Sequence, residues 1–70
     1  MNIEINKIGQ ISEGTHHGRF ITVEAELCLL GFEIIVSESK DMKAPVIVEW
    51  ADTFEELNTW FRDNAPNVVW

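Results

Sequence analysis

Hydrophobic and polar residues alternate along most of the first fifty positions, and this two-residue period is typical of half-buried β-strands. The pattern predicts strands over residues 2–8, 19–27, 32–37 and 46–50. The alternation changes parity around Gly9, which indicates a bulge or a bend at that point. Turn-forming residues at 12–18 and a polar segment at 37–45, which ends in a proline, predict loops between the strands.

The second and third predicted strands are expected to form a hairpin across residues 28–31. Pairing Leu27 with Phe32 brings the apolar residues of both strands onto one face, which supports this register. The same register sets Glu26 opposite Glu33 on the other face. Like charges opposed in this way destabilise a sheet by a few tenths to about 1 kcal/mol.

The period of the pattern changes after residue 52, where helical features begin. Thr53 and Glu56 have the spacing of a capping box, in which each side chain satisfies a free backbone N–H. A single apolar stripe follows at helical spacing, formed by Phe54, Leu57, Trp60 and Phe61. Pro66 ends the helix, so we predict a helix over 53–64 and a short closing strand over 67–70.

The predicted elements combine into one α+β domain over residues 1–70. We expect a three- or four-stranded antiparallel meander with the C-terminal amphipathic helix packed on one face. The helix stripe and the strand faces need each other, because neither can bury its apolar side alone.

The charge balance favours a basic protein as the partner. Twelve acidic and five basic residues give a formal net charge of −7. A field of that sign repels nucleic acids and anionic membranes, so direct binding to either is not expected. Association with a basic protein would be fast and sensitive to salt. Acidity also keeps small proteins soluble, which is the alternative explanation.

The cysteine content and the N-terminus predict a cytoplasmic protein. Cys28 is the lone cysteine and cannot pair within the chain, and in an apolar run it is expected to be a small buried hydrophobe. The N-terminus has no signal-peptide pattern, and the apolar runs are too short to cross a bilayer.

The chain is poor in catalytic motifs, so we predict neither an enzyme nor a cofactor. It has no phosphate-binding glycine loop, no zinc-type cysteine spacing and no nucleophile elbow. His16 and His17 are adjacent in a predicted loop, where their side chains diverge. We expect two solvated histidines there and no metal, although a weak surface site that includes Glu13 is an alternative.

The candidate binding surface is the sheet face that points away from the helix. Acidic side chains around exposed apolar ones suit a basic, partly apolar partner. Tryptophan at the rim of such a surface is a common interface anchor. The predicted binding residues are Phe20, Glu24, Glu26, Glu33, Ile35, Glu38, Asp41 and Trp50. An ordinary solvated face, with one apolar residue covered by the N-terminal strand, is the alternative.

The C-terminal part of the chain resembles the endings of small bacterial immunity proteins. The resemblance covers residues 46–70, from Val48-Glu49-Trp50-Ala51-Asp52-Thr53-Phe54-Glu55-Glu56-Leu57 through Trp60-Phe61 to Val68-Val69-Trp70. Such proteins neutralise toxins. The resemblance implies toxin binding, in which an acidic face occludes a basic active site, often that of a nuclease.

Two other functions compete with an inhibitor of this type. The chain could be a self-assembling domain, a homodimer joined through sheet edges or outer faces, with acidity serving solubility. It could also be a nucleic-acid mimic that blocks a DNA-binding enzyme, which requires carboxylates spaced like phosphates.

Overall fold

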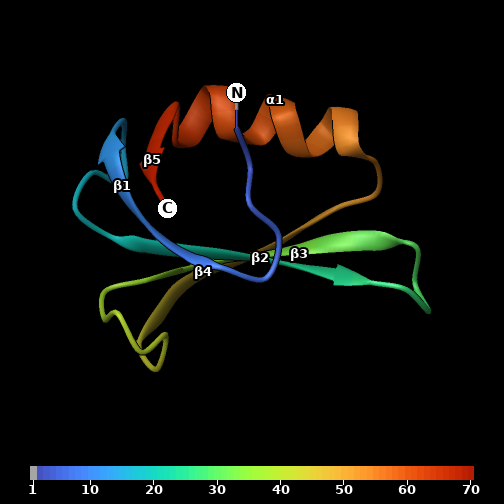
Figure 1. Cartoon of the computed structure of the whole chain (residues 1–70), viewed down its shortest axis with the longest axis horizontal. Helices are drawn as coiled ribbons and strands as arrows, with labels where there is room; N and C mark the ends of the chain where they lie inside the picture. Colours follow the sequence, from blue (N-terminus) through green and yellow to red (C-terminus); the bar gives the residue numbers. More distant parts are fainter. Residues whose placement is uncertain (1) are drawn as a thin grey trace.

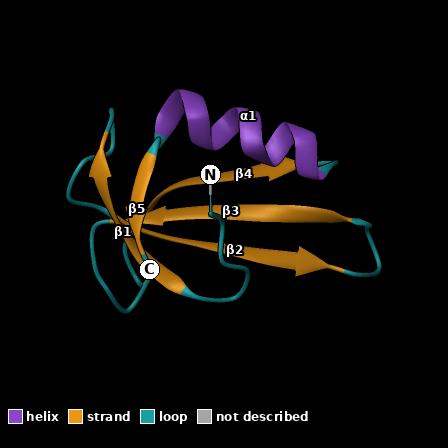
Figure 2. Ribbon diagram, turned by 45° about the horizontal axis from the view of Figure 1, so that its top comes forward, coloured by secondary structure: helices purple, strands orange, loops and turns teal. Residues whose placement is uncertain are grey.

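The computed structural model describes residues 2–70 and has a five-stranded antiparallel sheet with one helix, α1 (Phe54–Asn64), on one face (Figure 1). The strands are β1 (Ile8–Glu13), β2 (Phe20–Glu26), β3 (Gly31–Ser37), β4 (Pro45–Ala51) and β5 (Asn67–Val69). Their order in the sheet is β4-β3-β2-β1-β5, so β1 to β4 form a meander and β5 pairs with β1 (Figure 2). The predicted α+β architecture and the short closing strand are confirmed.

The hairpin of β2 and β3 is present, but its register differs by two residues from the predicted one. Ala25, rather than Leu27, pairs with Phe32, and Glu24, rather than Glu26, lies opposite Glu33. Because side chains alternate with a period of two, each strand residue keeps its predicted face. The connection keeps its predicted length of four residues but moves from 28–31 to 27–30.

The observed register is explained by the buried side chains at the centre of the hairpin. Val23 lies opposite Ile34 and Ile21 opposite Val36, and all four are fully buried. These cross-strand pairs of β-branched residues stabilise the sheet where it faces the helix. Leu27 therefore lies in the connection and not in β2, and it is exposed. The prediction that Cys28 is buried is wrong, because this residue is exposed as well.

The first strand begins later than predicted, because residues 2–7 are irregular. Asn6 has a φ of 60°, and its N–H donates to the carbonyl oxygen of Val23 at 2.8 Å, which turns the chain before β1. Ile3 and Ile5 are half-buried and pack against the core. Their alternation therefore reflects contact with the core and not membership of the sheet.

Gly9 lies inside β1 and not at a bulge. A Cβ at this position would lie 2.6 Å from Cγ1 of Val68 and 2.7 Å from Cε3 of Trp70. Glycine is therefore required for the close approach of the C-terminal segment. The irregularity in register lies further along, between Ile11 and Glu13, where β1 pairs with β5.

The predicted helix is confirmed, with Thr53 as its N-cap. Its hydroxyl accepts from the N–H of Glu56 at 3.1 Å, and the Glu56 carboxylate accepts from the N–H of Asp52 at 2.8 Å, one residue earlier than in a standard capping box.

The buried core consists of Ile11, Ile21, Val23, Ile34, Val36, Ala51, Leu57, Phe61 and Ala65. Within residues 2–70, no helix combines the length and apolar character needed to cross a membrane.

The predicted apolar stripe of the helix is buried only in part. Leu57 and Phe61 are fully buried, whereas Phe54 is 52% exposed. Phe54 lies in the first turn and meets Phe32 edge on, with the ring centroids 6.0 Å apart. The helix therefore starts beside the free end of the β2–β3 hairpin, as Figure 1 shows.

Candidate functional site: the outer face of the sheet

The sheet face opposite α1, here called the outer face, is the surface on which most predicted binding residues lie. In Figure 1 the helix and the N-terminal segment are on the other side of the sheet. The side chains on the outer face come from four strands and include Ile8, Thr22, Glu24, Glu26, Glu33, Ile35, Val48 and Trp50. Because Ile3 and Ile5 pack against the core, the N-terminal segment does not cover Ile35.

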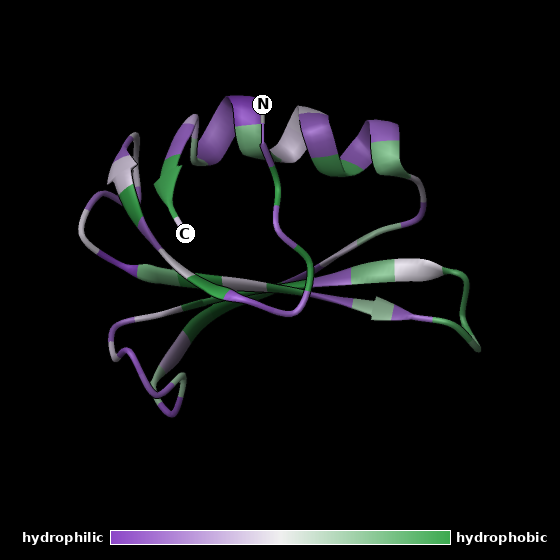
Figure 3. Ribbon diagram, in the orientation of Figure 1, coloured by the Kyte–Doolittle hydropathy of each residue, from purple (hydrophilic) through white to green (hydrophobic). Residues whose placement is uncertain are grey.

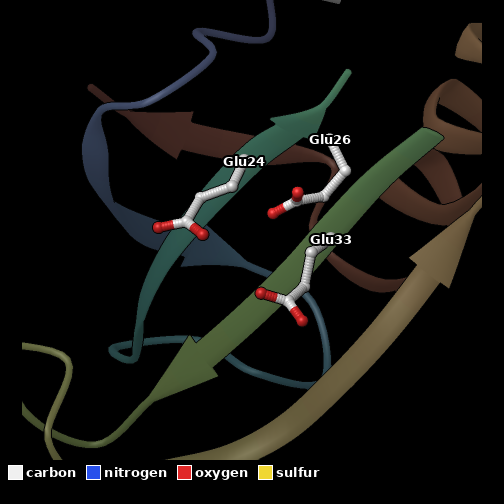
Figure 4. Close-up of side chains that lie close together, drawn as sticks. All are labelled: Glu24, Glu26 and Glu33. Atoms are coloured by element: carbon white, nitrogen blue, oxygen red, sulfur yellow. The ribbon is translucent and has the colours of Figure 1, made fainter. Parts of the chain in front are cut away.

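Three glutamates, called here the acidic trio, gather on this face from adjacent strands (Figure 4). Glu24 lies directly opposite Glu33, and Glu26 is the next residue of β2 on the same face. Each contributes a carboxylate oxygen, and these oxygens all lie within 4.8 Å of one another. Among residues 2–70, none of the ion pairs involves the trio.

This arrangement can receive a positive charge. Opposed like charges destabilise an antiparallel pair by a few tenths to about 1 kcal/mol, and a cation placed between them removes that cost. An arginine fork can bind carboxylates bidentately, and a lysine ammonium can donate three hydrogen bonds. A hard divalent cation also prefers carboxylate oxygens, so Glu24, Glu26 and Glu33 are the residues that could hold a metal.

The acidic trio borders a row of three apolar residues and one threonine, here called the apolar row, which crosses four strands. Ile8 pairs with Thr22, Thr22 with Ile35 and Ile35 with Val48, so these side chains lie side by side. Ile8 is 45% exposed and Val48 58% exposed. Ile8 and Val48 were not among the predicted binding residues, although the alternation within each strand places them on this face once the strand bounds are known.

Trp50 connects the acidic and apolar parts of the outer face. It pairs with Glu33, on the same row as the Glu24–Glu33 pair. The indole packs against Gly31, where a Cβ would collide with its ring, and its Nε1 donates to Oδ1 of Asp52 at 2.6 Å. A tryptophan that is partly exposed and held in one orientation is suited to anchor a partner.

The structure does not bring the remaining predicted residues to the acidic trio. Phe20 is at the far end of β2, opposite Ser37. Glu38 pairs with Arg19, 3.1 Å from its Nη2. Asp41 accepts from the hydroxyl of Ser39 and from the N–H of Lys43, and these hydrogen bonds hold the pKa of its carboxyl below the ordinary value of 3.8. Glu38 and Asp41 are therefore engaged in local contacts.

The two histidines do not converge on a common site. His16 is buried, with its Nδ1 2.9 Å from Nη1 of Arg19, whereas His17 is exposed. The prediction of a solvated side chain is thus wrong for His16, because the loop folds it against Arg19. The candidate ligand cluster found in residues 2–70 is the acidic trio, which neither histidine joins.

Comparisons with models of known protein families, with curated proteins and with solved structures find no match for this chain.

Proposed function

We propose that this chain is an acidic protein-binding domain whose outer face covers a basic, partly apolar surface of another protein, as an inhibitor does. The observation that carries the proposal is the acidic trio, whose three carboxylates lie together without a basic partner from residues 2–70. Beside it lie Trp50 and the apolar row, which provide area to bury.

The charge of the whole chain supports the same partner chemistry. A net charge of −7 attracts a basic protein over long range, and the acidic trio offers it a local contact. The resemblance of residues 46–70 to immunity proteins supports a toxin as the partner, for example a nuclease with a basic active site.

The test is an affinity capture of the tagged chain from its native host at low salt, followed by a salt gradient. We expect one basic protein to be retained in stoichiometric amount and released as salt rises, because screening weakens contacts between exposed charges. The double variant Glu26→Lys/Glu33→Lys should lose this protein.

A matched control separates the acidic trio from net charge. Glu4→Lys/Asp63→Lys changes the net charge equally, at positions in the N-terminal segment and near the end of α1. Both residues are in surface ion pairs, which contribute little to stability. Equal retention by both double variants would sink the assignment of the outer face.

Self-association is a second candidate, favoured by the exposed strand β4. This edge strand carries Val46, Val48 and Trp50, which are 43%, 58% and 41% exposed. An edge strand presents unpaired backbone groups with which a second strand can pair. Light scattering distinguishes the candidates, because a dimer that forms without any other protein would favour self-assembly.

A further inference from the structure

The connection between β2 and β3, here called the 27–30 loop, is the most exposed apolar segment of the chain. Leu27, Leu29 and Leu30 are 84%, 71% and 81% exposed, and Cys28 between them is also exposed. The loop projects from one end of the sheet, and Figure 3 shows its hydrophobic colour there. Consecutive exposed apolar residues are unfavourable in a folded chain unless they serve a function.

The backbone of this loop is also unfavourable for its sequence. Leu30 has a φ of 55°, in the left-handed region that favours glycine or asparagine. Within residues 2–70, no side chain hydrogen bond involves the loop. The leucines therefore improve neither the burial nor the hydrogen bonding of the loop, and strain of this kind points to a role outside folding.

The surroundings of the loop are apolar on one side and acidic on the other. Ala25, Leu27, Leu30 and Phe32 line a shallow depression of about 270 Å³. The acidic trio flanks it on the outer face. The first turn of α1, with two more glutamates, starts near Phe32.

The basic residues lie elsewhere. Lys7 directly precedes β1, beside β2, and is already in a surface ion pair. Arg19 precedes β2 at the opposite end of that strand, and Lys40 and Lys43 are in the connection between β3 and β4. Arg62 is in the last turn of α1. The hairpin end of the molecule therefore combines apolar side chains with negative charge.

We propose that the 27–30 loop is an anchor that inserts into an apolar pocket of the protein partner, with lysine or arginine side chains around the pocket that pair with the acidic trio. This inference rests on the proposed function and specifies the chemistry of the partner's surface. A loop of leucines beside three carboxylates is complementary to an apolar pocket with a basic rim.

Charge distinguishes this occupant from two others. A single short apolar segment anchors weakly to a bilayer and needs a second, usually basic, signal, whereas the neighbouring residues of this loop are acidic. Two copies that met through their loops would bring two acidic trios together, which is repulsive.

Cys28 provides a probe of the loop, because it is exposed and is the lone cysteine. An environment-sensitive nitrobenzoxadiazole label on Cys28 should shift to the blue when the protein recovered by the affinity capture is added. The same label on Thr15→Cys in a Cys28→Ser background, which places it in an exposed turn between β1 and β2, should not shift. A comparable shift with phosphatidylcholine vesicles alone would overturn the proposal in favour of a bilayer.

Affinity for the recovered protein then separates this inference from the proposed function. Leu27→Ser/Leu29→Ser should weaken binding by about 10- to 100-fold, and Thr59→Ala, at an exposed position of α1 on the opposite side of the sheet, should not. Unchanged affinity in the leucine variant, together with loss in Glu26→Lys/Glu33→Lys, overturns the anchor and leaves the proposed function standing. Unchanged affinity in the glutamate variant overturns the proposed function itself.

Discussion

The two connections that join β3 to its neighbours both reverse the direction of the chain, but one consists of apolar residues and the other mainly of polar ones. The 27–30 loop joins β2 to β3 with exposed leucines. Residues 38–44, here called the 38–44 loop, join β3 to β4 with polar side chains that bond to one another and to the backbone. Figure 1 shows the two loops at opposite ends of the sheet.

The 38–44 loop is held from within. The buried hydroxyl oxygen of Ser37 accepts from the N–H groups of Ser39 and Ala44, at 3.2 and 3.3 Å. Asp41 accepts from Ser39 and Lys43, and the N–H of Glu38 donates to the carbonyl oxygen of Ala44 at 3.1 Å. This loop contributes to the stability of the sheet, whereas the 27–30 loop leaves its apolar side chains exposed to solvent.

The largest effect should come from removing the hydroxyl that organises the 38–44 loop. Ser37→Ala removes a buried hydroxyl oxygen that accepts from two backbone N–H groups, those of Ser39 and Ala44. We expect it to lower the free energy of unfolding by about 1 to 3 kcal/mol, measured by urea denaturation. The control Ser12→Ala, at an exposed hydroxyl, should cost less than about 0.5 kcal/mol. If Ser37→Ala and Ser12→Ala lowered the free energy of unfolding equally, the Ser37 hydroxyl would not be what stabilises the 38–44 loop.

The second effect has the opposite sign and lies in the 27–30 loop. Leu30→Gly places glycine at a φ of 55°, where it has no steric penalty. We expect the free energy of unfolding to rise by about 0.5 kcal/mol, since relief of the left-handed strain exceeds the added freedom of the unfolded chain. Leu29→Gly, at a position without positive φ, should be destabilising under the same conditions. A Leu30→Gly variant less stable than the original chain would contradict the strain argument.

Removing the exposed leucines of the 27–30 loop should hardly change the stability of the fold, in contrast to Ser37→Ala beside the 38–44 loop. Leu27→Ser/Leu29→Ser changes two side chains that are more than two-thirds exposed. We expect the free energy of unfolding, measured by urea denaturation, to stay within about 0.5 kcal/mol of that of the original chain. A loss of several kcal/mol would show that the leucines stabilise the fold, and the loop would then resemble its polar counterpart.

The smallest effect concerns pH and should be confined to the 38–44 loop. Hydrogen bonds from Ser39 and Lys43 lower the pKa of Asp41 below 3.8. A lowered pKa contributes stability that is present above the ordinary value and is lost as pH falls through the pKa of the folded state. Ser39→Ala should move the pKa of Asp41 back up toward 3.8, as measured by NMR titration of the carboxyl. A pKa that does not move would show that this hydrogen bond does not hold the loop.

Much of the fold follows from the periodicity of the sequence, because alternation and the Thr53 cap each reflect a local requirement. The register of β2 and β3 was not predictable in the same way. A shift by two residues preserves the face of each side chain, so Leu27 opposite Phe32 and Ala25 opposite Phe32 satisfy the same pattern. The helix and the buried pairs of the hairpin decide between them, and these are tertiary contacts.

The residues of the candidate site also divide into those that the alternation places correctly and those whose contacts depend on the folded structure. Glu24, Glu26 and Glu33 could be placed on one face by alternation alone. Glu38 and Asp41 could not be separated from them, because a carboxylate that contacts a distant arginine or its own loop has the same sequence signal as one without such contacts. The exposure of the 27–30 loop escaped prediction for a related reason, since apolar runs usually indicate burial.

The pairing of β5 with β1 has a consequence for the order in which the sheet is completed. Glu26 and Gly31 are paired across four residues, whereas residue 10 is paired with residue 69. Closing the longer segment costs about 2 kcal/mol more in chain entropy. The meander can assemble progressively along the chain, but β1 remains an open edge until β5 pairs with it. A nascent or partly unfolded chain therefore offers other chains a strand that the finished protein conceals.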